Sequence, residues 1–575
     1  MDNIFDDLTV YGNNKGINSA PIITLSSSEA LDALLSNDFY CVVELPEYFD
    51  FSEVLKYAVD TIGNKTLDEC VKDGSLPDSM NGVNLDVITN KDGRYAVRPL
   101  TLTNPFLYYM LARDICNPPT WKAIKECFKL FTNDHISARA IPMVKVDDKL
   151  ESFKGATSIL NWWNSMEQRS IELSLKYRYM FITDITNCFG QINPESIAWA
   201  LARKDTPYQT EENAEIASKI QRYLRAMQEG KNIGIPQGSY LFSLIAEIIL
   251  GYTDMLLAQQ IAKEQTDGKL PKDLEYEIIR YVDDYRIFCN DRDALDRISY
   301  ILQHILEKFN FRMNSSKTRT SSELIADSIK PDKAFYIFNT PIESKQTYKD
   351  EDGHERKERG YDFDGFQKHL LFIYEFSRRF PNSGQIVTQL EAFSKRIENQ
   401  LPTKKISYKV QRIDLETGET TDLVESEERK GHLWENISAM VAIAVEIAAT
   451  NLRAANNALK VASQLLSDMR PEEQQKKKEI IGLIYKKLRP IPNSAFLQVW
   501  LQNITHLTDD WTLAEIYDMP LCKVVAKQPV TLWNNEWLRP EISSGFPQSS
   551  IVDREILVKN DQVIRFKAKR LYDDM

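Results

Sequence analysis

Residues 280–290, RYVDDYRIFCN, place two adjacent acids between two apolar, β-prone segments. The pattern predicts two short strands joined by a tight turn, with Asp283 and Asp284 where most hairpins carry Asn-Gly. A carboxylate among core residues costs several kcal/mol unless a positive charge compensates it. The stretch therefore favours a hairpin that holds metal ions over a hairpin with two ordinary turn acids.

A second acid, Asp184, ends the β-rich run YMFITDITNCF (179–189). Single acids at strand ends are common, so Asp184 alone fits a turn residue and a metal ligand equally well. Together with Asp283 it offers shared oxygen ligands for a pair of Mg²⁺ ions about 3.5–4 Å apart. Such a pair clamps the attacking and leaving oxygens of an in-line phosphoryl transfer, so nucleotide transfer is a candidate reaction.

The chain of 575 residues is too long for one compact core, and about 150 residues per domain predicts three or four folding units. Apolar residues make up 43% and charged residues 27%, as in soluble globular proteins. The seven cysteines are dispersed, which predicts reduced thiols in a cytoplasmic protein and no zinc site. The formal net charge of −12 argues against a protein that coats nucleic acid, but it leaves room for a local basic channel.

No membrane partner is predicted. The first ten residues, MDNIFDDLTV, are acidic and lack the pattern of a secretion signal. The longest apolar run, residues 240–258, carries Glu247 and Asp254, which a bilayer span of about 20 residues would seldom hold unpaired. We therefore expect a buried helix there.

The remaining order of elements follows from periodicity and turn residues. We expect helix over 40–66, a hairpin over VITNKDGRYAVRPLTL (87–102), helix over 104–131, and an inserted hairpin near 408–424. Asn104-Pro105 predicts a helix start. The rest of the C-terminal third is helical by period, and its successive helices with short joints are typical of helical repeats.

Between the two acidic motifs lies the string GIPQGSYLFS (234–243). Its two glycines let the backbone pass close to a bulky planar partner, and Pro236 stiffens the loop. The side chain of Gln237 can offer its amide to a sugar or base edge. A lone Gly-Ile-Pro-Gln-Gly is usually a plain loop, so the order of the motifs carries the argument.

In that order the motifs resemble those of the reverse transcriptase palm. DITNCF (184–189) is similar to motif A, GIPQGSYLFS to motif B, YVDD (281–284) to motif C and MNSSKT (313–318) to motif D. The resemblance covers residues 85–345. It implies an RNA-directed DNA polymerase with deoxynucleoside triphosphates as substrates and DNA as product.

The fold that the resemblance implies is α+β, a right-hand polymerase with fingers and an antiparallel palm sheet. Residues 1–345 would form this unit, with fingers over about 30–175 and palm over about 176–345. A polar linker is expected over 346–360. Residues 361–575 would form a mainly α-helical, repeat-like domain.

The similarity also assigns roles to individual residues. It gives metal binding, with Mg²⁺ or Mn²⁺, to four positions: Asp184, Ile185, Asp283 and Asp284. It gives a general-acid role near the leaving pyrophosphate to Lys317, and nucleotide binding to Arg98, Lys91, Arg94, Phe189, Gln237 and Gly238. The flat ring of Phe189 has no partner for a ribose 2′-hydroxyl, so deoxynucleotides would be favoured. The alternatives are a solvated lysine at 317 and a solvated strand face at Lys91 and Arg94.

RPLTLTNPFLYYMLARDI (98–115) and the long helical domain resemble the abortive-infection group of bacterial, defence-associated reverse transcriptases, related to AbiK and AbiA. That resemblance implies antiphage defence, a protein hydroxyl as primer, synthesis without a conventional template, and a homo-oligomer. Two alternatives stay open. One is a retron-like enzyme that copies a dedicated non-coding RNA, and the other is a catalytically silent scaffold that binds RNA or a partner defence protein.

Overall fold

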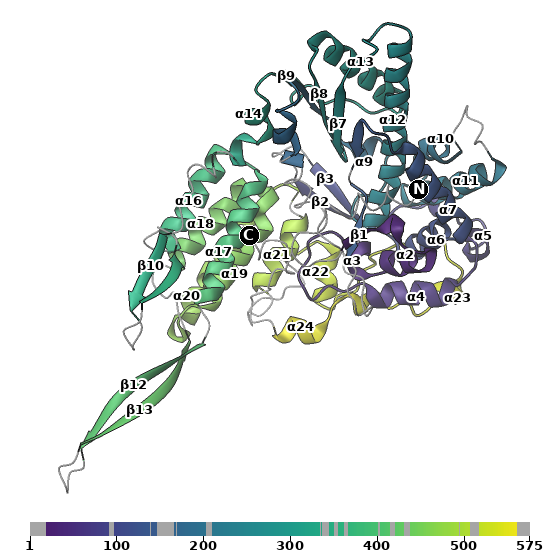
Figure 1. Cartoon of the computed structure of the whole chain (residues 1–575). Helices are drawn as coiled ribbons and strands as arrows, with labels where there is room; N and C mark the ends of the chain where they lie inside the picture. Colours follow the sequence, from purple (N-terminus) through teal and green to yellow (C-terminus); the bar gives the residue numbers. More distant parts are fainter. Residues whose placement is uncertain are drawn as a thin grey trace.

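The computed structural model describes residues 19–90, 97–145, 166–202, 210–335, 344–349, 355–360, 366–400, 403–413, 420–430, 437–505 and 517–559, except the single residues 139, 168, 334 and 494. Figure 1 shows a sheet with helices at one end, a group of helices on the other side, and a body between them. Early and late segments of the chain lie together in that body.

The first part of the chain supplies most of the body. Its elements are β1 (Ser19–Pro21), η1 (Ile22–Thr24), α2 (Ser27–Leu34), α3 (Asn37–Tyr40), α4 (Ser52–Ile62), α5 (Leu67–Cys70), η2 (Pro77–Ser79), β2 (Leu85–Asn90), β3 (Val97–Leu102), α6 (Pro105–Ile115) and α7 (Pro118–Phe131). The expected hairpin is confirmed as the antiparallel pair of β2 and β3, and its turn lies outside the described residues.

Two helix predictions in this part were too long. Over 104–131 the chain forms α6 and α7, because Pro118 and Pro119 cannot donate the backbone hydrogen bonds that would continue α6. The start at Asn104 is confirmed, since its side chain accepts from the Phe106 amide at 3.1 Å. Over 40–66 only α4 is a full helix, and Pro46 interrupts the segment before it.

A five-stranded sheet follows, and it confirms the expected polymerase palm. Its strands are β4 (Ile136–Ala138), β6 (Tyr179–Asp184), β7 (Tyr276–Tyr281), β8 (Asp284–Cys289) and β9 (Arg319–Ser321), in the order β4-β7-β8-β6-β9. All neighbours are antiparallel except β4 and β7, which run parallel at one edge. The associated elements are β5 (Met143–Lys145), which pairs with β1, and α9 (Cys188–Gln191), α10 (Ser196–Ala202), α11 (Glu211–Met227), α12 (Tyr240–Thr266), α13 (Arg292–Lys308) and α14 (Leu324–Ser328).

Helix α12 runs through the interior. By length and composition it could cross a bilayer, but 78% of its most apolar stretch is buried inside the protein. A core helix passes the same test, and the expectation of a buried helix is met. Among the described residues, no other helix has that length and apolarity.

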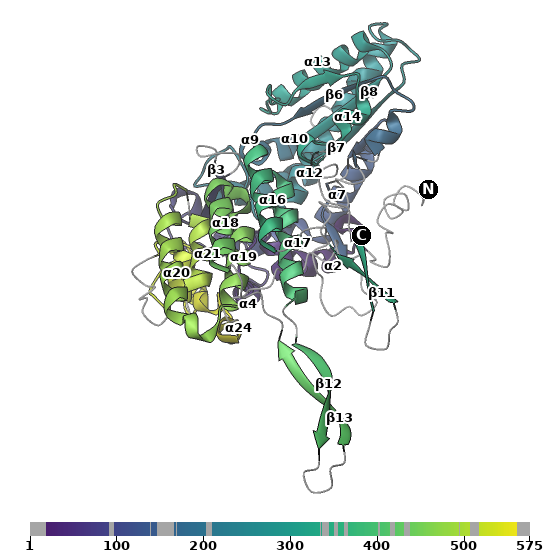
Figure 2. The ribbon, with the colours of Figure 1, turned by 90° about the vertical axis from the view of Figure 1, so that its left-hand side faces the viewer.

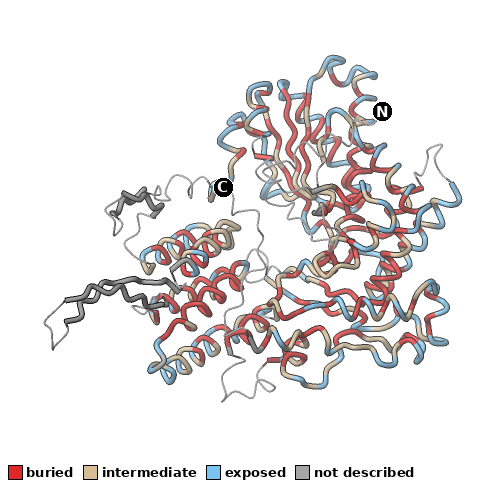
Figure 3. Tube along the Cα trace, turned by 60° about the horizontal axis from the view of Figure 1, so that its bottom comes forward, coloured by how far each residue is buried: buried red, intermediate tan, exposed pale blue. Residues whose placement is uncertain are grey.

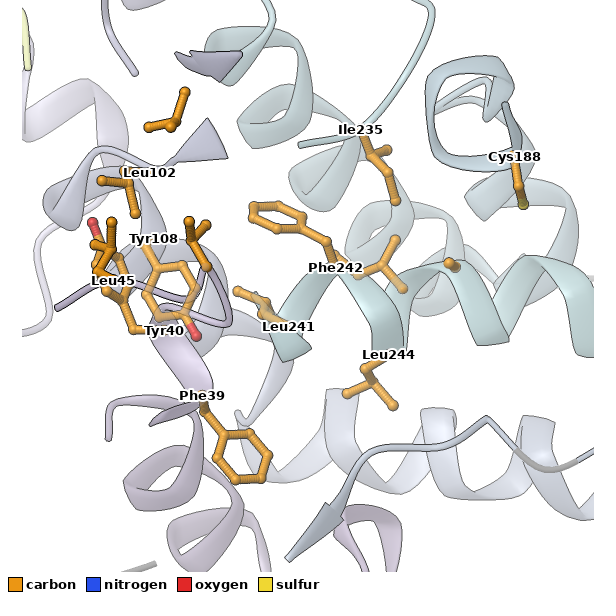
Figure 4. Close-up of a cluster of buried hydrophobic side chains, with 14 of the residues drawn as sticks. Phe39, Tyr40, Leu45, Leu102, Tyr108, Cys188, Ile235, Leu241, Phe242 and Leu244 are labelled. Carbon is orange, nitrogen blue, oxygen red and sulfur yellow. The ribbon is translucent and has the colours of Figure 1, made fainter. Parts of the chain in front are cut away.

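One large buried cluster extends across the molecule, and a smaller cluster around Met180 and Phe288 is separate from it. Figure 3 shows buried residues running from the sheet through the body into the group of helices. In the close-up of Figure 4, Leu102 and Tyr108 of the body lie near Phe242 of α12, with Ile235 and Cys188 beyond it. All five side chains belong to one buried cluster. The body and the palm therefore share their packing and cannot move as separate units without opening it.

The third part of the chain is helical, as expected. It contains α16 (Phe366–Arg379), α17 (Gly384–Gln400), α18 (Ile437–Thr450), η3 (Leu452–Ala454), α19 (Ala455–Ser467), η4 (Pro471–Glu473), α20 (Gln474–Leu488) and α21 (Ala495–Thr505). The fully buried Ala444 and Ala448 let α18 approach α16 and α19 closely. Helices α21 and η3 also pack against β2, so this helical region touches the fingers hairpin directly.

Two hairpins interrupt the third part. The hairpin expected near 408–424 is present as β12 (Thr403–Ile413) and β13 (Thr420–Lys430), and Figure 2 shows it projecting away from the helices. The linker expected over 346–360 is wrong, because β10 (Ser344–Lys349) and β11 (Glu355–Gly360) pair there. Both strands consist almost wholly of polar residues, so no apolar alternation in the sequence marked them.

The last described segment returns to the N-terminal body, which the expected boundary at 361 does not allow for. It contains α22 (Pro520–Val525), α23 (Pro540–Ser543), η6 (Gln548–Ile551) and α24 (Arg554–Lys559). The indole of Trp533 donates to the Leu102 carbonyl at 2.9 Å, and Lys72 N donates to the Trp537 carbonyl at 2.8 Å. Both tryptophans are fully buried, so this segment completes the core of the body.

A buried histidine in the helical region predicts a pH-dependent stability. Burial, with the guanidinium of Arg396, lowers the pKa of His369 to about 4, and Arg396 Nη1 donates to its Nδ1 at 3.3 Å. An unfolded histidine has a pKa of about 6.5. Between pH values of about 6.5 and about 4, His369 is protonated in the unfolded chain but neutral in the folded chain. The free energy of unfolding therefore falls as the pH falls.

We expect the wild type to lose about 2 kcal/mol more between about pH 7 and about pH 5 than His369→Gln, measured by urea unfolding. The exposed His304 is the matched control, and His304→Gln should keep the pH dependence of the wild type. Equal slopes for wild type and His369→Gln would contradict the prediction.

Candidate active site

The sheet brings the two acidic motifs together. In the antiparallel register of β6 and β8, Asp184 and Asp284 are direct partners across the strands. The amide of Ile185 donates to the Asp283 carbonyl at 3.0 Å. Facing residues in such a ladder have Cα atoms about 4.5–5.5 Å apart. Carboxylates that are distant in the sequence therefore meet at one end of two neighbouring strands, which Figure 2 shows side by side.

The turn between β7 and β8 is strained. Tyr281 and Asp284 are cross-strand partners, so Val282 and Asp283 form a two-residue loop. Val282 has φ of +48°, a value that a β-branched residue rarely adopts and that hairpins normally give to glycine or asparagine. Strained backbone of this kind persists only where the surroundings hold it, and it concentrates at functional sites.

The MNSSKT stretch lies beside Asp184. The amide of Asn314 donates to the Asp184 carbonyl at 2.9 Å, and Lys317 Nζ donates to Asp184 Oδ2 at 2.5 Å. Burial lowers the pKa of Lys317, but the hydrogen bond to Asp184 and the negative charges of Asp184, Asp284 and Asp283 together outweigh it, and the net pKa is raised. The side chain of Lys317 is thus protonated and in contact with the carboxylate of Asp184.

Nearby positive charge offsets only part of the burial and mutual repulsion of the carboxylates. Burial raises the pKa of Asp283 to about 6, and the nearby Asp284 and Asp184 add to the effect. Burial also raises the pKa of Asp284, although Lys330 opposes it. The Oδ1 atom of Asp184 is buried and has no hydrogen-bond partner. Three acids and an unsatisfied oxygen together make a site that a cation would stabilise.

The donor set fits a hard divalent cation. Carboxylate oxygens are the ligands that Mg²⁺ and Mn²⁺ prefer, and the unpartnered Oδ1 of Asp184 is free of competing hydrogen bonds. Within the described part of the chain, no three His, Cys, Asp or Glu side chains are already grouped as around a metal ion. The ammonium of Lys317 instead neutralises Asp184.

The loop of residues 234–238 is bound to the protein along its whole length. The amide of Ile235 donates to the Phe189 carbonyl at 3.0 Å, and the Thr101 amide donates to the Gln237 carbonyl at 2.6 Å. A Cβ on Gly238 would lie 2.5 Å from the Thr101 oxygen. This glycine is therefore required by the close approach of the fingers strand, whereas the sequence suggested an approach to substrate.

Three of the other predicted nucleotide-binding residues are described, and each lies in or next to an element that the loop contacts. Phe189 lies in α9 and is half-buried, and Gln237 is partly exposed. Arg98 is half-buried on β3, three residues before Thr101 and thus on the strand that the loop binds. Lys91 and Arg94 lie outside the described residues. The assigned roles of these five remain predictions.

A buried cation behind the turn was not predicted from the sequence. Arg280, directly before the YVDD motif, is fully buried, and its partners are Glu247 and Asp254 of α12. The sequence signal for a buried cation was the pair Glu247 and Asp254, seven residues apart in an otherwise apolar helix. Such acids need a buried cation, but their spacing does not say where in the chain it lies.

Residues 125–365 match the family model described as "Reverse transcriptase (RNA-dependent DNA polymerase)". No curated protein sequence matches the chain. Among solved structures, apo telomerase of Candida tropicalis truncated from its C-terminal domain aligns with 13% identity and a TM-score of 0.28, over 48% of this chain and 56% of its own. The chain thus spans little more than half of that relative.

Two further telomerase structures align over more of the chain. Apo telomerase of Candida tropicalis has 11% identity and a TM-score of 0.27, with 80% of this chain and 70% of its own covered. Telomerase of Candida albicans in complex with a fragment of telomeric RNA has 12% identity and a TM-score of 0.26, with 74% and 67% covered.

The contact between Gly238 and Thr101 gives a local test of the site. We expect Gly238→Ala to push β3 away from the loop and to destabilise the protein by about 1–3 kcal/mol more than Gly268→Ala. Gly268 is a matched control because it also has positive φ, +73°, but nothing lies within 4 Å of a Cβ there. Hydrogen exchange should show faster exchange at the Thr101 amide in Gly238→Ala only, and unchanged protection would contradict the prediction.

Proposed function

We propose, from the reverse transcriptase domain that residues 125–365 carry, that the chain is a DNA polymerase that adds deoxynucleotides to a growing strand. The observation that carries the proposal is the convergence of Asp184, Asp283 and Asp284 at one end of β6 and β8. A cluster of partly buried acids beside a strained turn has no evident purpose in a structural sheet. It suits a reaction in which phosphate charge must be compensated.

The chemistry assigns a task to each part of the site. Mg²⁺ or Mn²⁺, held by the carboxylates of Asp184, Asp283 and Asp284 and by the Ile185 carbonyl, would neutralise phosphate charge and activate the attacking hydroxyl. Arg98, with Lys91 and Arg94, would bind the triphosphate through charged hydrogen bonds. Gln237 and Gly238 would border the nucleotide. Lys317 is cationic beside Asp184, and it would donate a proton to the leaving pyrophosphate.

The carboxylates can be tested by an isosteric change. We expect Asp283→Asn to lower deoxynucleotide incorporation by about 10³-fold or more, because it removes a charge that acts at the reacting phosphate. The raised pKa of Asp283 shows that its charge is unfavourable in the fold, so the melting temperature should stay equal or rise. Incorporation of labelled deoxynucleotides by purified protein measures the effect.

The exposed Asp273 supplies the control, and Asp273→Asn should incorporate at the wild-type rate. Equal incorporation by wild type and Asp283→Asn would reject the polymerase assignment. A catalytically silent scaffold that binds RNA or protein would then be the remaining interpretation.

The choice of sugar depends on Phe189. We expect Phe189→Val to make room for a 2′-hydroxyl and to raise incorporation of ribonucleotides relative to deoxynucleotides by about 10–100-fold. Phe496, which is also half-buried but lies in the helical region, is the control position. The ratio of kcat/KM for the two nucleotides measures the effect, and an unchanged ratio would remove Phe189 from the sugar site.

We infer further that the enzyme acts in the cytoplasm in bacterial antiphage defence, as a homo-oligomer and without a membrane partner. The support is the resemblance of residues 98–115 to abortive-infection reverse transcriptases and the helical region that follows the palm. In this proposal a protein hydroxyl primes synthesis and no conventional template is needed. A non-coding RNA or a partner defence protein would regulate it.

The priming proposal can be tested separately. Labelled deoxynucleotides are supplied one at a time, with and without nuclease pretreatment. A product that stays on the protein after denaturation supports protein priming, and a free product rejects it. A structured RNA that copurifies and serves as template would instead identify a retron-like enzyme.

A further inference from the structure

The guanidinium of Arg280 is buried directly behind the catalytic turn. Arg280 lies on β7 and is 0% exposed, and its Nη1 donates to the Val282 carbonyl at 3.1 Å. That carbonyl belongs to the peptide that joins Val282 to Asp283. The arginine therefore fixes the plane of the peptide from which the Asp283 side chain departs, at the residue whose φ of +48° is strained.

Two acids from α12 hold the guanidinium in place. Glu247 binds it with both oxygens, with Nη1 to Oε1 at 3.0 Å and Nη2 to Oε2 at 3.1 Å. Asp254 Oδ2 accepts from Nε at 2.7 Å. Such a two-pronged pair fixes the orientation of the planar group as well as its position. The network thus sets the direction in which Arg280 presents its second Nη1 hydrogen to the turn.

The network also reaches β8. Tyr285, the cross-strand partner of Arg280, donates its hydroxyl to Asp254 Oδ1 at 3.2 Å. The two carboxylates are buried to within a few per cent, and an ion cluster this deep is a poor way to gain stability compared with apolar packing. A role beyond packing accounts for its presence beneath the turn.

The helix that carries both acids begins at the loop of residues 234–238. The loop is hydrogen-bonded to β3 of the fingers, and α12 follows it from Tyr240. A displacement of the loop would therefore shift Glu247 and Asp254, and Arg280 would pass the shift to the turn. The guanidinium of Arg280 thus links the loop of residues 234–238, which is assigned to nucleotide binding, with the Val282–Asp283 turn, which is assigned to metal binding.

We propose that Arg280, Glu247 and Asp254 are positioning residues that hold the Val282–Asp283 turn in its metal-binding conformation and couple it to the loop of residues 234–238. The inference rests on the proposed function, because it takes the carboxylates as metal ligands. None of the three residues touches substrate. They act through the Val282 carbonyl.

The test separates this role from plain stability. Arg280→Met alone leaves two buried acids without a cation and is expected to unfold easily. The triple variant Glu247→Gln, Asp254→Asn and Arg280→Met removes all three charges, keeps the volume, and should recover most of the wild-type melting temperature. It still lacks a donor to the Val282 carbonyl, so the turn stays unsupported.

We expect the triple variant to bind Mn²⁺ about 10–100-fold more weakly, measured by electron paramagnetic resonance. Its kcat should fall by a similar factor, while KM for the deoxynucleotide changes little. The control is the pair Glu264→Gln and Arg297→Met, which removes another ion pair of α12, the one between Glu264 and the partly exposed Arg297 of α13. This control should bind Mn²⁺ and turn over like the wild type.

The inference would be overturned if the triple variant had the same Mn²⁺ affinity and kcat as the wild type. It would also be overturned if the wild type bound no Mn²⁺, or bound Mn²⁺ with an affinity that Asp283→Asn does not lower. If the wild type binds Mn²⁺ through Asp283 but incorporates no nucleotide, only the polymerase proposal is rejected. The Mn²⁺ affinity of the triple variant would then still test whether Arg280, Glu247 and Asp254 position the turn.

Discussion

The register between β6 and β8 is the constraint on which the site depends. It sets Asp184 opposite Asp284 and brings the Ile185 amide to the Asp283 carbonyl. Side chains alternate between the two faces of a strand, so a slip of one residue would turn Asp184 to the opposite face. The apolar residues that fix this register, such as the fully buried Met180 and Ile287, thereby also fix the relative positions of the acids.

In the candidate site, repulsion among the acids is opposed by stabilising contacts from Lys317 and Arg280. Burial and mutual repulsion raise the pKa of Asp283, and Lys317 compensates part of the charge on Asp184. The strained Val282 is held from behind by Arg280. The protein thus keeps a locally unfavourable arrangement because the surrounding core determines it, which is common where a ligand is to supply the missing interaction.

The sequence predicted features that short stretches encode. The hairpins β2–β3, β7–β8 and β12–β13 were foreseen because turn residues and alternation are local, and the acids stood out because they interrupt apolar strands. Features that depend on distant partners were not foreseen. The strands β10 and β11 lack an apolar face, and the partner of Glu247 and Asp254 could not be identified before the fold placed Arg280 beneath α12.

The same limit applies to the boundary of the helical region. Trp533 and Trp537 would suit the core of any domain, and nothing in their neighbourhood shows that they pack against Leu102 and Lys72. Only the folded chain shows that the segment after α22 belongs to the body. The expected boundary at 361 was drawn from periodicity, which describes elements but not the surfaces they cover.

That returning segment has a consequence for the synthesis of the protein. The amide of Asp50 bonds to the Ile551 carbonyl, so residues some five hundred positions apart close one core. A ribosome adds about 5–20 residues per second, so the N-terminal part of the body is made tens of seconds before Trp533 and Trp537 can complete its core. Apolar surface of the early body therefore stays exposed during that interval, which makes the unfinished chain prone to aggregation.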